Sequence, residues 1–435
     1  MRLFDIALQL KGFDIKKATR VLHDIQSLNN HEFEAQLNQK KTAIVNYHLN
    51  NNPFYKSLVG NQNDVSWNEL PIITKRDLQR PLTERLSTGF TTSNVYINKT
   101  SGSSGDPFVF AKDKWCHAMT WAVIMNRFSW YNIDFNSSKQ ARFYGIPLDK
   151  KGYYKERLKD KMANRFRFSV FDLSDEAFEK ALYKFKTTPF EYLNGYTSPV
   201  VQFAKFLKRK SVILKNICPS LKVCMVTSEM LFDSDRKLLE TQFGVPMVNE
   251  YGASELDLIA FENPVGEFQL NGETLFVEIV DDTGKSVPNG EEGRIAITSL
   301  YNKAHPFIRY DIGDIGIISK SCTAQKPILK ELVGRTNDIA ILPSGKKAAG
   351  LTFYYITKSL IEDSGNVKEF VIEQLKTDQF LIRYVSLKPL SEEELLTIRE
   401  KMIVYLEDGI QIQFKREEQL ERQKSGKLKQ FISHL

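Results

Sequence analysis

The spacing of hydrophobic residues divides the chain into stretches with different patterns. Apolar residues recur at helical intervals through residues 1–50, and a loop rich in Asn and Pro is expected at Asn50–Pro53. Farther along, a buried strand at Leu221–Val226, a helix over Asp233–Phe243 and a second strand at Val245–Tyr251 follow one another. This strand–helix–strand order predicts parallel neighbours, whose carboxyl ends are the usual place for a ligand.

The last part of the chain has a different texture. After residue 265, short alternating strands with Gly and Asp turns predict an antiparallel, partly barrel-like unit. The final hundred residues predict a β-β-α-β unit, with a boundary near Gly334-Arg335. We therefore expect an α/β protein. A large N-terminal domain, residues 1–335, combines parallel α/β sheets with a small barrel-like β unit, and residues 336–435 form a small α+β C-terminal domain.

Two helix starts can be predicted from hydroxyl side chains, which accept hydrogen bonds from the first free backbone N–H groups. Ser174 precedes a helix over Asp175–Phe185, and Thr197 or Ser198 precedes a helix that runs through Leu207. An earlier helix, beginning near Asp113, carries several aromatic residues, which we interpret as core rather than as a ligand site.

Composition narrows the classes of protein. Among 435 residues there are 60 Lys and Arg, 53 Asp and Glu and 42% hydrophobic residues, which are ordinary globular values. The net charge of +7 permits a positive cleft for an anionic ligand without arguing for nucleic acid. The four cysteines form no C-x-x-C pair. Asp5 falls where the apolar stretch of a signal peptide would have to be, so we expect none here. No apolar stretch is long enough to span a membrane. We expect a cytoplasmic protein of unknown oligomeric state.

Residues 100–107 form the strongest local motif. Thr100-Ser101-Gly102-Ser103-Ser104-Gly105-Asp106-Pro107 puts hydroxyl and backbone donors around one turn, which suits a polyphosphate. It is not a Walker A loop, because no Gly-Lys-Ser/Thr follows. On its own, the motif fits a surface hairpin loop equally well.

Four later motifs are weaker one by one. The strand end Asn249–Glu255 could stack a purine and hold Mg²⁺, and Asp314 in Ile308–Asp314 could accept hydrogen bonds from ribose hydroxyls. Gly334–Asp338 lies at the predicted boundary, and Lys424–Lys427 lies on a loop near the C-terminus. Taken alone, each also fits an ordinary turn or a solvated surface.

In their order and spacing, these five motifs resemble those of the adenylate-forming superfamily of acyl-CoA synthetases, peptide-synthetase adenylation domains and luciferases. Pro53-Phe54-Tyr55, Leu70-Pro71-Ile72-Ile73-Thr74-Lys75 and Gly195-Tyr196 resemble its phenylacetate–CoA ligase branch, and within it the CapK-type proteins associated with polysaccharide biosynthesis. The resemblance covers nearly the whole chain. It implies an ATP- and acyl-binding N-terminal domain and a mobile C-terminal lid that carries the catalytic lysine.

The resemblance implies a nucleotide site as well. Tyr251 would pack on adenine, and Asp314 and Arg335 would hold the ribose. The full set of positions for ATP is Thr100, Ser101, Gly102, Ser103, Ser104, Gly105, Ser228, Glu229, Tyr251, Gly252, Asp314 and Arg335.

The same resemblance implies the catalytic groups. Ser254 would contact the α-phosphate, Glu255 would bind Mg²⁺, and Lys427 would bridge the carboxylate and the α-phosphate. The hinge would lie at Asn337 and Asp338, where the family commonly has Asp or Lys at the first position.

Other positions depart from the family or concern the acid. Ser254 replaces the usual Thr and keeps the hydroxyl, whereas Ile312 replaces a Thr and loses one. Tyr196 is expected to line the acyl pocket together with the loops at residues 227–229 and 251–255. The acid itself and the acceptor are not readable from the sequence.

The predicted activity is therefore ATP-dependent activation of a carboxylic acid as its acyl-adenylate, with release of pyrophosphate. The acyl group would then pass to a thiol, of CoA or a carrier protein, or to an amine. Two alternatives stay open: an adenylyltransferase that places AMP on a non-carboxylate acceptor, and a non-catalytic nucleotide-binding module. The expected cofactors are ATP and Mg²⁺, with CoA as one acceptor.

Overall fold

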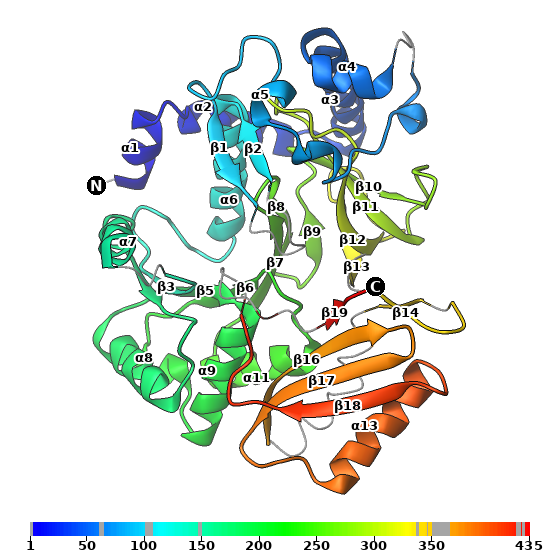
Figure 1. Cartoon of the computed structure of the whole chain (residues 1–435). Helices are drawn as coiled ribbons and strands as arrows, with labels where there is room; N and C mark the ends of the chain where they lie inside the picture. The colour runs from blue at the N-terminus through cyan, green and yellow to red at the C-terminus, as the bar shows by residue number, and fades with distance from the viewer. Residues whose placement is uncertain are drawn as a thin grey trace. The chain divides into compact units, whose positions relative to one another are not determined.

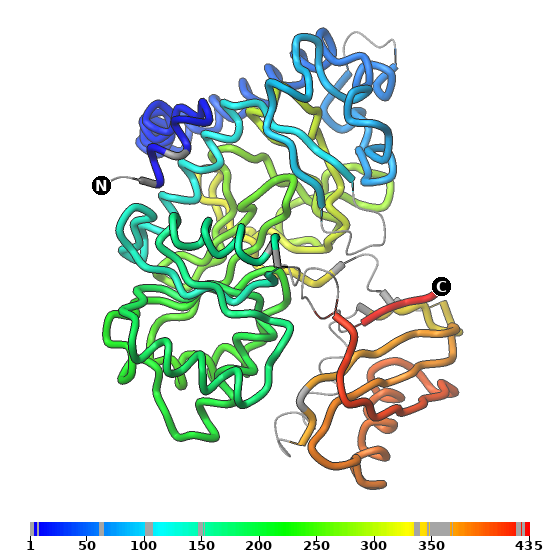
Figure 2. Tube along the Cα trace, turned by 60° about the vertical axis from the view of Figure 1, so that its left-hand side comes forward, coloured from blue at the N-terminus to red at the C-terminus, as the bar shows by residue number. Residues whose placement is uncertain are grey.

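The computed structural model describes residues 3–60, 65–100, 108–146, 150–335, 339–345, 347–349, 366–422, 428 and 431–435. The chain divides into two compact units (Figures 1 and 2). The first contains residues 1–312 and 316–331, and the second contains residues 313–315 and 332–435.

Helices dominate the start of the first unit and cover its main sheet. The α-helices described there are α1 (Leu3–Leu10), α2 (Ile15–Gln26), α3 (Asn30–Asn51), α4 (Pro53–Val59), α5 (Leu82–Arg85), α6 (Lys114–Ser129), α7 (Lys150–Met162), α8 (Asp175–Thr187), α9 (Thr197–Arg209), α10 (Leu214–Ile217) and α11 (Asp233–Phe243). Short 3₁₀ turns lie at η1 (Trp67–Glu69) and η2 (Asp77–Gln79).

The main sheet of this unit has seven strands in the order β4-β3-β5-β6-β7-β8-β9. They are β3 (Gln140–Phe143), β4 (Arg165–Phe168), β5 (Tyr192–Tyr196), β6 (Val223–Thr227), β7 (Met247–Ala253), β8 (Asp257–Glu262) and β9 (Phe268–Leu270). The five strands from β4 to β7 are parallel, and β8 and β9 continue the sheet antiparallel. The predicted parallel pair around α11 is confirmed.

Two hydrophobic cores lie on opposite faces of this sheet. Leu193, Cys224 and Val226 point to a core shared with α8, α9 and α11, whereas Met225 and Val248 point to a core shared with α2 and α6. Figure 1 shows these two groups of helices on opposite sides of the sheet, and Figure 2 shows the N-terminal helices beside α6. Because β6 is covered on both faces, its residues from Val223 to Val226 form a continuous apolar run.

Smaller sheets complete the N-terminal part of the fold. Strands β1 (Tyr96–Lys99) and β2 (Val109–Lys112) form an antiparallel pair. A four-stranded sheet has the order β10 (Leu275–Val280), β11 (Glu292–Ser299), β12 (Tyr310–Ile318) and β13 (Leu329–Arg335). Its first two strands are antiparallel, as the alternating pattern predicts.

The second unit is built around a four-stranded sheet in the order β18-β17-β16-β19. Its described elements are β14 (Ile339–Ile341), β15 (Lys347–Ala349), β16 (Val367–Lys376), β17 (Gln379–Ser386), α13 (Glu392–Tyr405), β18 (Gln411–Arg416) and β19 (Phe431–Ser433). Ser391 and Glu394 form a capping box at the start of α13. The predicted β-β-α-β order is confirmed, and β19 adds a further strand parallel to β16.

Two local predictions are wrong, each for a physical reason. The expected loop at Asn50–Pro53 is almost absent, because α3 extends to Asn51 and Asn52 caps α4 by accepting a 2.8 Å hydrogen bond from the amide of Tyr55. Neither Thr197 nor Ser198 caps α9 with its side chain. A carboxylate from another part of the chain takes that role, as described below.

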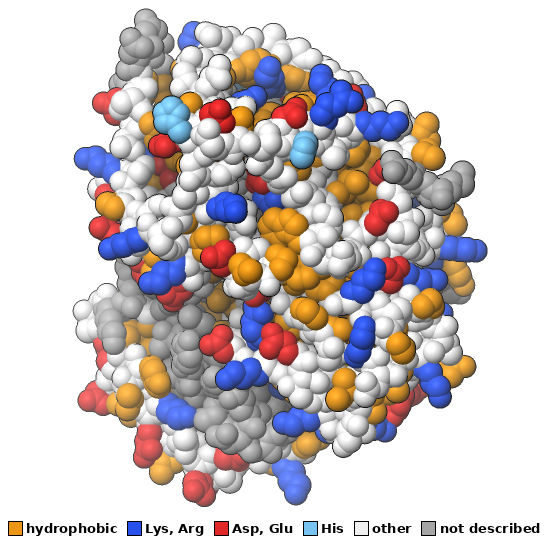
Figure 3. All heavy atoms as spheres, turned by 180° about the vertical axis from the view of Figure 1, so that it is seen from behind, with side chains coloured by type: hydrophobic (Ala, Val, Ile, Leu, Met, Phe, Trp, Pro, Cys, Tyr) orange, Lys and Arg blue, Asp and Glu red, His pale blue; other side chains and the backbone are white. Residues whose placement is uncertain are grey.

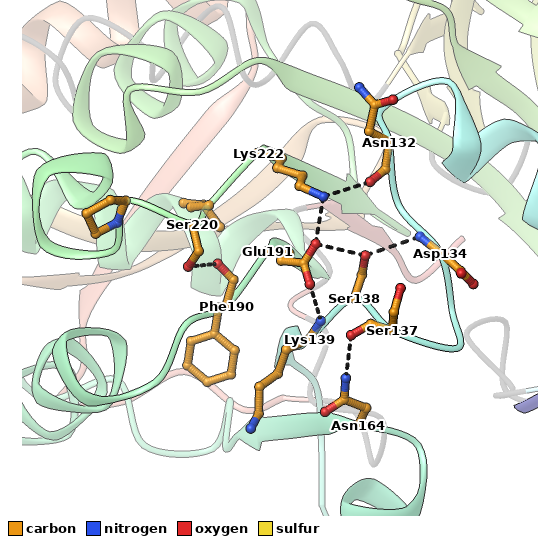
Figure 4. A network of polar contacts seen from close by, with 12 residues as sticks. Asn132, Asp134, Ser137, Ser138, Lys139, Asn164, Phe190, Glu191, Ser220 and Lys222 are labelled. Carbon is orange, nitrogen blue, oxygen red and sulfur yellow. Dashed lines mark hydrogen bonds and ion pairs between the residues drawn. The ribbon is translucent and has the colours of Figure 1, made fainter. Parts of the chain in front are cut away.

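A network of hydrogen bonds fastens the amino ends of the parallel strands (Figure 4). Glu191, directly before β5, accepts from Nζ of Lys222 at 2.6 Å, from the hydroxyl of Ser138 at 3.1 Å and from the amide of Lys139 at 3.3 Å. Burial alone would raise the pKa of Glu191, but the bonds from Lys222 and Ser138 outweigh it and lower the pKa. Asn164, before β4, bonds the carbonyl of Ser137 at 2.9 Å. At this edge, polar contacts therefore link β3 to β5, β5 to β6 and β4 to β3.

Charged groups are mixed over the visible surface. On the face shown in Figure 3, basic and acidic side chains are interspersed with apolar ones rather than gathered by sign. Within the described part of the chain, no helix is both long enough and apolar enough to cross a membrane.

Candidate functional site

The carboxyl ends of β6 and β7 lie side by side in register, with Thr227 opposite Glu250. Beyond Thr227 the chain turns through Ser228, whose φ of 72° is left-handed, and so directs Glu229 toward the start of α9. There Glu229 accepts hydrogen bonds from the amide of Ser198 at 2.6 Å and from its hydroxyl at 3.2 Å. Because this carboxylate caps the helix, its first role is structural.

The turn between β7 and β8 depends on a glycine. A Cβ atom at Gly252 would lie 2.6 Å from the carbonyl oxygen of Asp257, so only glycine allows this approach. Tyr251 before it is buried, whereas Ser254 at the tip of the turn is exposed. The carboxylate of Asp257 forms an ion pair with Lys112 of β2, which ties β2 to this turn.

Glu255 follows in the same turn and is buried, with 7% of its surface exposed. Its Oε1 accepts a 2.9 Å hydrogen bond from the hydroxyl of Tyr310, at the start of β12. The preceding residue, Arg309, is fully buried and binds Glu278 through Nε at 3.1 Å and the carbonyls of Leu70 and Gly284 at 2.9 and 2.7 Å. Arg309 therefore fixes the backbone from which Tyr310 reaches Glu255.

The donor set around Glu255 fits a magnesium ion that arrives with a nucleotide. Tyr310 binds Oε1 only, and no hydrogen bond from a described residue reaches Oε2. The described residues contain no group of three or more His, Cys, Asp or Glu that could hold a metal by themselves. Mg²⁺ commonly uses one or two carboxylates and completes its ligands with phosphates and water, so Glu255 suits such an ion.

Thr100 closes the base of the predicted phosphate loop. Its amide donates to the carbonyl of Phe108 at 3.0 Å, and its Oγ1 accepts from the amide of Phe108 at 3.0 Å. Ser101, Gly102, Ser103, Ser104 and Gly105 lie outside the described residues.

A buried polar network supports β2, the strand that follows this loop. Arg85 donates to the carbonyl of Val109 at 2.7 Å and contacts the ring of His305. Nε2 of His48 lies 2.9 Å from the carbonyl oxygen of Asn302. Burial lowers the pKa of His48 to about 4, and it lowers the pKa of His305 well below the usual value. Both rings are therefore neutral near pH 7.

The remaining predicted site residues lie farther along the chain. Asp314 lies within β12 and is 6% exposed. Arg335 ends β13, but its side chain is outside the described set. Asn337, Asp338 and Lys427 also lie outside it.

Tyr196 lies at the end of β5, in register with Thr227, as expected for a residue of the carboxyl edge. Its ring packs on Tyr144 with 4.5 Å between the centroids, and burial raises its pKa. Sequence reasoning missed two polar residues beside it, Arg142 in β3 and Asn194 in β5. A signal was present, because a polar residue within a buried strand is uncommon unless it has a partner.

The chain was compared with family models and with curated proteins. No family model matches the chain. The protein CapK of Staphylococcus aureus is 25% identical over 353 residues, which cover 77% of this chain and 76% of that protein. A phenylacetate–coenzyme A ligase of Thermus thermophilus is 29% identical over 131 residues, 28% of this chain and 29% of the ligase.

Among solved structures, 2-hydroxyisobutyryl-CoA ligase in the postadenylation state superposes with a TM-score of 0.68 at 15% identity, over 94% of this chain and 90% of the ligase. This likeness shows the fold. The chain has the α/β architecture of the adenylate-forming ligases, and its sequence is related to CapK and, over a shorter stretch, to phenylacetate–CoA ligase. The resemblance inferred from the five motifs is confirmed.

Proposed function

We propose that this protein is an adenylate-forming ligase. It activates a carboxylic acid with ATP and transfers the acyl group to a thiol or an amine. The observation that carries the proposal is the buried Glu255, held by Tyr310 beside the carboxyl ends of parallel strands. The relationship to CapK over most of the chain supports it.

In the first step, an oxygen of the substrate carboxylate attacks the α-phosphorus of ATP. A new P–O bond forms, the bond to the β-phosphate bridge breaks, and pyrophosphate leaves. Negative charge increases on phosphoryl oxygens, so positioned donors and cations stabilise the transition state. Magnesium held at Glu255 would neutralise phosphate charge when it is bound.

The residues assigned to this step are part of the proposal. Ser254 lies on an exposed turn, where its hydroxyl can meet the α-phosphate. Tyr251 offers an aromatic face to adenine, and Asp314 accepts from the ribose hydroxyls with help from Arg335. Lys427 supplies the cation between the carboxylate and the phosphate. The loop from Thr100 to Gly105 holds the phosphates.

The second step transfers the acyl group. The thiol or amine attacks the acyl carbon, AMP leaves with the bonding electrons, and the nucleophile loses its proton. The domain that carries Lys427 acts as the lid, with Asn337 and Asp338 as its hinge. CoA, a carrier protein and a sugar amine are the acceptors to test. A role in polysaccharide biosynthesis is what the resemblance of the sequence motifs to CapK-type proteins implies. The proposed location is the cytoplasm. The four cysteines, all of them free thiols, are in keeping with a reducing compartment.

Pyrophosphate release from ATP, measured over a panel of acids, tests the proposal. We expect release only when an acid is present, and faster turnover when CoA or an amine is added. Pyrophosphate release that depends on a phosphate or alcohol acceptor instead would indicate an adenylyltransferase. Tight ATP binding without release under every condition would indicate a non-catalytic module.

A further inference from the structure

Polar side chains from four neighbouring strands share one face of the main sheet at its carboxyl edge. Arg142 of β3 is the register partner of Asn194 of β5. Tyr196, two residues farther along β5, is the register partner of Thr227 in β6. Thr227 is in turn the register partner of Glu250 in β7. Partners in parallel strands point to the same face, as do residues two apart. This face is the one on which Met225 and Val248 pack toward α6.

Two of these side chains have buried donors that the described residues leave unused. Asn194 is 6% exposed, and its Oδ1 accepts a 3.0 Å hydrogen bond from the hydroxyl of Tyr144. Its Nδ2 is buried and has no partner among the described residues, and the same is true of Nε of Arg142. Buried polar groups are nearly always hydrogen-bonded, so two unused donors on one face point to an absent acceptor.

The charges around Arg142 lead to the same conclusion. On the adjacent strand β4, Arg165 pairs with Asp160 at 2.6 Å, and Arg167 pairs with Asp160 and with Glu156. Within the described part of the chain, Arg142 has no such ion pair; its guanidinium lies over the ring of Tyr144, 4.1 Å from the centroid. A cation with a buried Nε and no counter-ion is unfavourable in the free protein and favourable once an anion binds.

Glu250 does not supply that anion. It lies two strands away from β5, with its register partner Thr227 between them, and burial raises the pKa of its carboxyl, opposed by the hydrogen bond with Thr227 and by the charge of Arg142. Glu250 thus interacts with the charge of Arg142 without forming an ion pair with it, and the buried donors of Arg142 and Asn194 stay unused among the described residues.

We infer that the acid activated by this protein carries a second carboxylate, which binds between Arg142 and Asn194 while the first is adenylated. A carboxylate accepts from both unused donors and neutralises Arg142, and such charge-assisted bonds are the stronger kind. Tyr144 and Tyr196 would pack on the carbon chain between the two carboxylates. This inference rests on the proposed function and makes Arg142 and Asn194 the residues that determine specificity.

The test compares three matched sets of acids in the pyrophosphate assay: linear dicarboxylates, their half-amides, and monocarboxylates of equal length that end in a methyl group. The parent protein should use the best dicarboxylate with a kcat/KM at least about tenfold above its methyl-ended partner, because that partner leaves buried donors unpaired. A half-amide as good as the dicarboxylate would overturn the second carboxylate in favour of a neutral acceptor.

Variants locate the effect. Arg142→Met removes the charge and should bring the ratio of dicarboxylate to monocarboxylate close to one, and Asn194→Asp, which keeps the size of the side chain, should lower it as well. Lys222→Met is the control, because it removes an equal charge at the amino edge of the same sheet; it should keep the parental ratio. Melting curves check that each variant is folded.

The outcomes distinguish a wrong substrate class from a wrong enzymatic function. Acid-dependent release that favours methyl-ended acids, or a ratio unchanged in both Arg142→Met and Asn194→Asp, overturns the dicarboxylate inference and leaves the ligase standing. No release with any acid counts against the proposed function itself.

Discussion

Tyr310, the first residue of β12, donates its hydroxyl hydrogen over 2.9 Å to Oε1 of Glu255, which lies in the turn between β7 and β8 of another sheet. Both are buried, with 1% and 7% of their surfaces exposed. The carboxylate is therefore held in one orientation before any ligand arrives. A preorganised group of this kind loses little entropy when a metal–nucleotide complex binds.

Glu255→Gln should impair use of Mg²⁺–ATP far more than it impairs folding. The amide keeps an oxygen for the Tyr310 bond but loses the negative charge. We expect pyrophosphate release at limiting Mg²⁺ to fall by about 10²-fold, with a melting temperature near that of the parent. Parental rates across a magnesium titration would refute the assignment.

Tyr310→Phe is the companion variant, because it removes only the hydroxyl that orients Glu255. The bond is worth about 1.5–3 kcal/mol with a charged acceptor. A milder effect is expected, with the magnesium concentration for half-maximal rate raised several-fold. A larger loss than in Glu255→Gln would mean that Tyr310 acts on something other than this carboxylate.

Asp314→Ala should raise the KM for ATP while the protein stays folded. Losing two ribose hydrogen bonds of about 1 kcal/mol each weakens binding about tenfold or more. Isothermal titration calorimetry with ATP measures the change directly. Unaltered ATP affinity would show that Asp314 does not contact the ribose.

Lys427→Ala should lower kcat for acyl-adenylate formation by about 10²-fold or more, because an ammonium between carboxylate and α-phosphate acts mainly in the transition state. The second half-reaction, started from supplied acyl-adenylate, should be nearly unchanged. The neighbouring Lys424→Ala is the control, with the same charge on the same segment. Parental adenylation rates in both variants would show that the C-terminal match is accidental.

Stability should fall on mild acidification because of the buried histidines. An unfolded histidine has a pKa of about 6.5, whereas burial lowers the pKa of His48 to about 4, although its backbone hydrogen bond with Asn302 acts in the opposite direction. Protons therefore bind the unfolded chain first. The stabilising contribution is present above pH 6.5 and is lost as the pH falls toward 4.

Urea unfolding at about pH 7.5 and pH 5 measures this loss, to which His48 contributes at most about 2 kcal/mol. His48→Gln should reduce the pH dependence, since the amide can still donate to Asn302 but does not titrate. His23→Gln, at an exposed position, should leave it unchanged. An identical pH dependence in parent and His48→Gln would contradict the neutral, buried state of this ring.

Periodicity predicted the elements of the fold well where local spacing decides the structure. The helix over Asp233–Phe243 and the helix start at Ser174 are present as expected. The prediction of the helix cap at Thr197 or Ser198 was wrong, because a residue far away in the sequence caps that helix. Glu229 caps α9 from 31 residues away, so no local pattern at Ser198 could have revealed it. For the candidate site, the motifs singled out Glu255 as a prediction, whereas its hydrogen-bond partner Tyr310 is brought to it only by tertiary structure.

The hydrogen bonds of Glu191 with Lys222 and Ser138, drawn in Figure 4, lie at the opposite edge of the sheet from the candidate site. The contacts of Glu191 hold β3, β5 and β6 together at their amino ends. The side chains at the carboxyl ends are therefore needed less for keeping these strands in place. Substitutions at Arg142 or Asn194 leave the contacts of Glu191 intact, so we expect them not to shift the strands. Paralogues with the same scaffold could diverge toward new acids by changing that edge alone, and directed evolution of altered substrate choice should begin there.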